Sequence, residues 1–137
     1  MDLSNPVIQF CIEGTQAEFL GQIDKARSLY RQAWETAQDD FDACVAAHYM
    51  ARHQDDLEKR LHWNQVALER ADAVADERVR EFYPSLWINM GQSYELLGNQ
   101  DKARRYYDMA AELGVIHRGD QVSAGGAVSC NDVMSGA

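Results

Sequence analysis

Apolar residues recur every three or four positions along most of the chain, and no long stretch alternates with a period of two. Steps of three and four place side chains on one face of an α-helix. The pattern therefore predicts an all-α protein with helices over about 6–20, 24–37, 40–53, 56–74, 76–97 and 100–113. Pro84 falls inside the fifth of these and removes a backbone hydrogen bond. The fifth helix is therefore either kinked or preceded by a separate short turn over 77–83.

The segment WINMGQSYELLGNQDKARRYYDMA, residues 87–110, contains two apolar stripes that are separated by Gly98 and Asn99. Glycine readily adopts the left-handed conformation that ends a helix. Asp101 then suits the first turn of the next helix, where an acidic side chain complements the helix dipole. The segment is thus predicted to form a hairpin of two packed helices.

The same spacing of small and aromatic residues occurs more than once. Steps of five, four and three residues connect Gly98, Ala103, Tyr107 and Ala110, and the same steps connect Gly21, Ala26, Tyr30 and Ala33. Both copies also contain the string DKAR. A weaker copy between them places Asp55, Arg60, Asn64 and Ala67 at the equivalent positions. A residue pattern that recurs along the chain at intervals of about 20–50 residues, as this one does, is typical of repeat proteins.

A helical hairpin of about 34 residues with this spacing resembles a tetratricopeptide repeat. The resemblance implies a right-handed α-α superhelix of three hairpins, or about six helices. The units would cover about 5–37, 39–74 and 76–114, within a repeat domain over 1–114. Residues 115–137 are rich in Gly, Ser and Ala and show no apolar stripe, so we expect a flexible tail there.

Composition narrows the range of partners. The chain has 137 residues, a net charge of −9 and 46% hydrophobic residues, which is enough for the core of one domain. An acidic chain without a basic stripe is not expected to bind nucleic acid. No apolar run is long enough to cross a bilayer, and the N-terminus does not resemble a secretory signal, so no membrane association is expected. The three cysteines, Cys11, Cys44 and Cys130, are widely spaced, which favours reduced thiols and a cytoplasmic location.

The residues that could carry chemistry do not form a recognisable site. His48 and His53 are five apart and do not share a helix face, whereas zinc needs three or four converging ligands. The acidic clusters at 39–42 and 55–58 lack a calcium loop and precede predicted helices, which favours helix capping. Cys11 and Cys44 are predicted to be buried structural thiols. We therefore expect no metal, no cofactor and no catalysis.

The resemblance also implies where a ligand would bind, because the first helix of each hairpin lines a concave groove in that family. It places eight residues in a peptide groove: Phe19, Tyr49, Arg52, His53, Ile88, Gln92, Glu95 and Leu96. The alternative is that these are ordinary solvated helix positions. An apolar strip with a few charges suits a helix or an extended peptide. Arg52 is the only base other than histidine in this set.

These observations favour a non-enzymatic protein–protein interaction module that binds a peptide or helical segment of a partner. One alternative is a self-associating structural or scaffold unit, which would form a homodimer through the uncapped terminal hairpin. Another is an accessory subunit of an enzyme encoded elsewhere.

Overall fold

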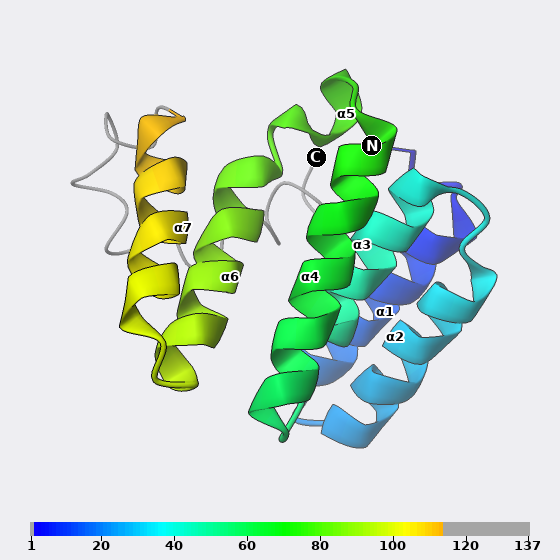
Figure 1. Cartoon of the computed structure of the whole chain (residues 1–137). Coiled ribbons are helices and arrows are strands. Elements are labelled where there is room, and N and C mark those ends of the chain that lie inside the picture. The colour runs from blue at the N-terminus through cyan, green and yellow to red at the C-terminus, as the bar shows by residue number, and fades with distance from the viewer. Residues whose placement is uncertain (1, 114–137) are drawn as a thin grey trace.

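Three helical hairpins stand side by side in the computed structural model, which describes residues 2–113 (Figure 1). The hairpins pair α1 (Pro6–Phe19) with α2 (Ile23–Thr36), α3 (Asp40–Met50) with α4 (Leu57–Val74), and α6 (Tyr83–Leu96) with α7 (Gln100–Glu112). Helix α3 packs on α1 and α2, and α6 packs on α4. The prediction of an all-α superhelix of hairpins is confirmed over this part of the chain. The prediction of a flexible tail concerns 115–137, outside the described residues.

The short helix α5 (Glu77–Arg80) connects the second hairpin to the third. Helix α6 begins after it at Tyr83 and holds Pro84 in its first turn, where the missing N–H group is not needed by the helix. Of the two alternatives for this region, the separate short turn is therefore correct. Val79 and Phe82 are both buried and attach the connection to the core.

Polar side chains cap the helix starts. The Asp39 carboxylate accepts a hydrogen bond from the Asp42 backbone N–H at 2.8 Å, and the Asp56 carboxylate accepts one from Glu58 at 2.9 Å. Such bonds satisfy N–H groups that the first turn leaves without partners. Capping thus accounts for the acidic clusters at 39–42 and 55–58, as the sequence predicted.

Glycines bring the two helices of the first and third hairpins together. A Cβ atom added at Gly14 would lie 2.3 Å from Cε1 of Tyr30, and one added at Gly91 would lie 2.6 Å from Cε1 of Tyr107. Real Cβ atoms do not approach a ring this closely, so neither tyrosine ring leaves room for a Cβ atom unless it moves. These two Gly–Tyr contacts are the same feature of the repeat, seen in two copies.

One apolar core runs from α1 through α4 to the start of α6. Tyr30 and Tyr49 pack in it with their ring centroids 5.2 Å apart and their planes tilted by 31°, and Leu86 is the last core residue toward the third hairpin. Cys11 and Cys44 are buried in the same cluster, which confirms the prediction of buried thiols. No helix among residues 2–113 has the length and apolar character that a membrane span requires.

Candidate interaction groove

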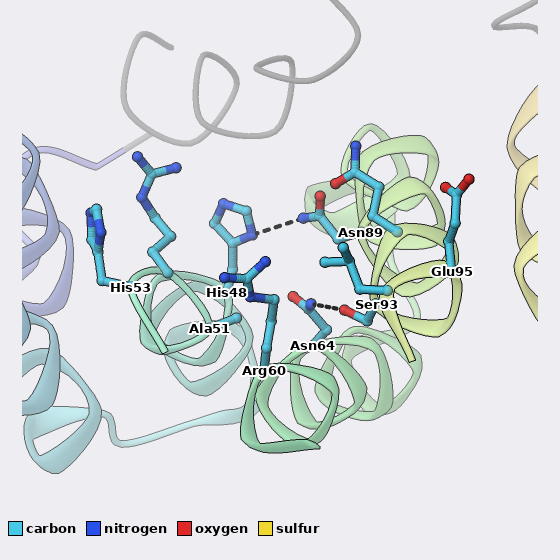
Figure 2. A pocket seen from close by; sticks show the side chains of 11 residues that line it. His48, Ala51, His53, Arg60, Asn64, Asn89, Ser93 and Glu95 are labelled. Carbon is cyan, nitrogen blue, oxygen red and sulfur yellow. Dashed lines mark hydrogen bonds between the residues drawn. The ribbon is translucent and has the colours of Figure 1, made fainter. Parts of the chain in front are cut away.

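A pocket of about 450 Å³ opens between α3, α4 and α6, at the boundary of the second and third hairpins (Figure 2). Its volume lies in the range of small-molecule and peptide sites. We call it the interhairpin pocket. Its walls come from the end of α3, the first turns of α4 and the second half of α6, and its residues are His48, Ala51, Arg52, His53, Arg60, Asn64, Asn89, Gln92, Ser93, Glu95 and Leu96.

Polar side chains bridge the second and third hairpins inside this pocket. Asn64 Nδ2 donates a hydrogen bond of 2.8 Å to Ser93 Oγ, and both residues are buried. Asn89 Nδ2 lies 3.5 Å from Nδ1 of His48, which is also buried. Figure 2 shows both interactions as dashed lines between α6 and the second hairpin. Buried polar groups need such partners, so these contacts hold the two hairpins in place while leaving other polar atoms facing the pocket.

The pocket lies where the second hairpin departs from the repeat. Spacings of 34 and 43 residues place His48 at the position of Gly14 and Gly91, and they place Asn64 at the position of the two tyrosines. The second hairpin therefore has no Gly–Tyr contact. An asparagine fills much less space than a tyrosine ring, so a shallow polar hollow replaces a packed aromatic side chain.

A charged cluster forms the wall of the pocket on the side of the first hairpin. Arg52 Nε and Nη2 donate hydrogen bonds of 2.8 and 2.5 Å to the two carboxylate oxygens of Glu18. Nε2 of His53 lies 3.0 Å from Glu18 Oε1, and the Tyr30 hydroxyl donates to the same oxygen. Burial by itself would raise the pKa of Glu18, but the hydrogen bonds from Arg52 and Tyr30 and the nearby charges outweigh it, and the pKa lies below its ordinary value.

The eight residues predicted for the groove occupy different places. Five of them line the interhairpin pocket: Arg52, His53, Gln92, Glu95 and Leu96. Ile88 is half-buried on α6 and does not line it, and Phe19 is 92% exposed at the end of α1. Tyr49 differs most from the expectation, because it is only 1% exposed and packs on Tyr30 in the core. It therefore supports the groove from inside the protein instead of facing a ligand.

Sequence reasoning did not select His48, Arg60, Asn64, Asn89 or Ser93 for this site. Arg60 and Asn64 lie on a second helix, which the family pattern places outside the groove. They reach the pocket because α6 packs on α4 as well as on its hairpin partner α7. The signal available in the sequence was the loss of the tyrosine at position 64 in the weaker copy.

The arrangement suits recognition of polar groups better than bond-breaking chemistry. Ser93 Oγ accepts its hydrogen bond from an asparagine, and His48 pairs with Asn89, so neither forms a nucleophile–base pair with the other. Among residues 2–113 no group of three or more His, Cys, Asp or Glu side chains could hold a metal ion. Side-chain amides both donate and accept hydrogen bonds, as a peptide group does, so they can pair with the backbone of an extended chain.

Fold and pocket together define a protein of stacked helical hairpins with a polar groove between two of them. Residues 84–113 match the family model described as tetratricopeptide repeat, and this range covers nearly all of α6 and all of α7. The third hairpin is thus similar to a tetratricopeptide repeat, and this match supports membership of that family. No curated protein and no solved structure matched the chain in the corresponding comparisons.

Proposed function

We propose that this protein is a non-enzymatic interaction module that binds an extended peptide segment of a partner protein in the interhairpin pocket. The observation that carries the proposal is the set of amide side chains from two hairpins, Asn64, Asn89 and Gln92, around one open pocket. Tetratricopeptide repeats are in general interaction folds, and these amides supply the hydrogen bonds that a peptide backbone needs.

The charges around the pocket favour a peptide of mixed character. Arg52 is already paired with Glu18, so it adds little net positive charge. Arg60 donates one hydrogen bond to the Gln54 carbonyl and has further N–H groups for a ligand, while Glu95 stands on the opposite wall. Leu96 is 53% exposed beside them and offers an apolar contact. A bound peptide would therefore place an acidic residue near Arg60 and an apolar residue near Leu96.

The test uses the full chain as bait for a displayed library of random dodecapeptides, followed by calorimetry with the selected peptides. Gln92 is exposed in the pocket, so Gln92→Trp should fill the pocket and weaken binding by at least about tenfold, or ~1.4 kcal/mol. The matched control is Gln32→Trp, which places the same ring on the exposed side of α2 and should leave binding unchanged. If Gln92→Trp and Gln32→Trp bound the selected peptides with equal affinity, the proposal that the interhairpin pocket binds them would be refuted.

A second candidate function is self-association through the terminal hairpin. The exposed side chains of Leu96 and Leu97, which are adjacent at the end of α6, favour it, because large exposed apolar residues that lie together often mark an interface. Sedimentation velocity over the micromolar range distinguishes the two functions. A mass that doubles with concentration, and that returns to the monomer value in Leu97→Glu, would support self-association.

A further inference from the structure

The junction between the first and second hairpins contains a socket that the second hairpin fills. Glu18, Arg27 and Tyr30 form the socket on α1 and α2. Arg52 enters it and binds Glu18 through both carboxylate oxygens. Arg27 Nε and Nη2 donate hydrogen bonds of 3.0 and 2.7 Å to the His53 backbone carbonyl, just beyond the end of α3. The socket thus holds the C-terminal end of α3 through two contacts. Glu18 binds the Arg52 side chain, and Arg27 binds the His53 backbone carbonyl.

The third hairpin carries the same set of residues at the same positions. A shift of 77 residues converts Glu18, Arg27 and Tyr30 into Glu95, Arg104 and Tyr107, and it converts Gly14 into Gly91. The internal geometry is also repeated, because the Tyr107 hydroxyl donates a 2.7 Å hydrogen bond to Glu95 Oε1, as Tyr30 donates to Glu18. We call Glu95, Arg104 and Tyr107 the terminal socket.

The terminal socket is not filled by the described part of the chain. Glu95 and Arg104 are exposed and Tyr107 is only half-buried, whereas the side chain of Glu18 is 10% exposed and Tyr30 is 1% exposed. Among residues 2–113, Arg104 makes no hydrogen bond or ion pair, and α7 packs extensively on α6 alone. Figure 2 shows Glu95 on the side of α6 that lies toward α7 and away from His48 and Asn89.

We propose that the terminal socket is a docking site for a partner protein, and that it binds the C-terminal turn of a partner helix that carries an arginine. The arginine would form a bidentate pair with Glu95, and Arg104 would bind a free carbonyl at the end of the partner helix. Carboxylates bind arginine with this fork geometry, and the last carbonyl groups of a helix attract a positive charge. This site shares Glu95 with the interhairpin pocket, but Arg104 and Tyr107 do not line that pocket.

Charge complementarity favours a partner over a second copy of this chain. If a second copy stacked its first hairpin on the third, Glu18 would stand where Arg52 stands in the filled socket, opposite Glu95. Two carboxylates at that distance repel each other. The chain does not supply the arginine at the repeat spacing either, because the residue 34 positions after Glu95 is Ser129, whereas the residue 34 positions after Glu18 is Arg52.

The natural occupant of the filled socket provides a defined probe. A fluorescent peptide of residues 39–54 with Cys44→Ser, acetylated and amidated, contains α3, Arg52 and His53. Fluorescence anisotropy against the full chain should show saturable binding. Arg52→Ala in the peptide should weaken binding at least about tenfold, since it removes the charge-assisted bidentate contact. Glu95→Gln and Arg104→Ala in the protein should each weaken it several-fold.

Matched variants separate the socket from general charge effects and from the groove. Arg105→Ala removes the same charge from the next exposed position on α7 and should not change peptide affinity. Gln92→Trp, which blocks the interhairpin pocket, should also leave the probe bound, so failure of one site does not imply failure of the other. If the probe does not bind the wild-type chain, or binds Glu95→Gln and Arg104→Ala as it binds Arg105→Ala, the proposal is overturned.

Two further outcomes would replace the partner with another occupant. Higher probe affinity in Arg118→Ala would show that the C-terminal segment of this chain occupies the socket. A dimer that dissociates in Glu95→Gln would show that a second copy does. Both results contradict the assignment to a partner, and unchanged affinity and a monomer in these measurements support it.

Discussion

Arg52 of the second hairpin binds both carboxylate oxygens of Glu18 of the first hairpin, across the boundary between the two hairpins. The Glu18 side chain is 10% exposed and that of Arg52 is 32% exposed. A charge in such a position is tolerated only because its partners replace the water it has lost. The pair therefore fixes how the first two hairpins sit on each other, and its loss should be measurable.

Replacing Arg52 with alanine leaves the Glu18 carboxylate buried without its main partner. Removal of one member of a buried pair costs about 3–5 kcal/mol, and the partial exposure of Arg52 reduces this to about 2–4 kcal/mol of unfolding free energy. Urea denaturation measures the loss. Arg31→Ala on the exposed side of α2 serves as the control and should change stability by less than about 0.5 kcal/mol. Similar losses in both variants would contradict this role for the pair.

The lowered pKa of Glu18 predicts a pH dependence of stability with a definite sign. The folded protein holds this carboxyl group ionised at pH values where the unfolded chain already binds the proton. The contribution of the ionised Glu18 carboxylate to folding stability is therefore complete above the unfolded pKa of about 4.5. It is lost as the pH falls through the lower pKa of the folded state. Between about pH 7 and about pH 3, the unfolding free energy should fall less steeply in Glu18→Gln than in the wild type.

Glu35→Gln is the control for that measurement, since Glu35 is exposed on α2. It should retain the wild-type slope between neutral and acid pH. A Glu18→Gln profile that runs parallel to that of the wild type would show that the ion pair contributes nothing to the pH dependence.

The two Gly–Tyr contacts should respond differently to an added methyl group. Gly14→Ala places a Cβ atom 2.3 Å from the Tyr30 ring, which is fully buried and cannot move aside. Overpacking costs about 1–3 kcal/mol, of which the better helix propensity of alanine returns up to about 1 kcal/mol. Gly91→Ala meets the Tyr107 ring, which is half-buried and can shift toward solvent. Thermal denaturation should therefore rank Gly14→Ala as the less stable variant, and the reverse order would disprove this explanation.

Burial should make Cys11 and Cys44 inert. It raises the pKa of both thiols, and for Cys44 burial and the negative charge of Asp72 raise the pKa to about 12. The reactive thiolate is thus scarce at neutral pH. Cys130, the third cysteine, lies outside the described residues. A Cys130→Ser variant therefore leaves only the thiols of Cys11 and Cys44 to react. They should react with a thiol reagent such as DTNB only after guanidinium unfolds the chain. Fast labelling of the native variant would contradict the buried state.

Much of the architecture could be predicted because its signals are local. The steps between Gly21, Ala26 and Tyr30, repeated 77 residues later, depend only on which side chains share a helix face. Asp39 was correctly predicted as a cap because capping involves neighbouring backbone atoms. The break before α6 was foreseen as one of two alternatives, since Pro84 disfavours a continuous helix without specifying where the new one starts.

The sequence by itself therefore determined the helical hairpins, their repeat and the burial of Cys11 and Cys44, because periodic spacing decides which face of a helix is apolar. Only the tertiary structure decided that Tyr49 is buried, that Arg52 binds Glu18 and that Asn64 meets Ser93. These contacts join residues about 30 or more positions apart, and they depend on how one hairpin packs on the next. The interhairpin pocket belongs to this second kind, since it is formed at a hairpin boundary. The residues of the terminal socket follow from the repeat, but only the tertiary structure decided that Glu95 and Arg104 are exposed there.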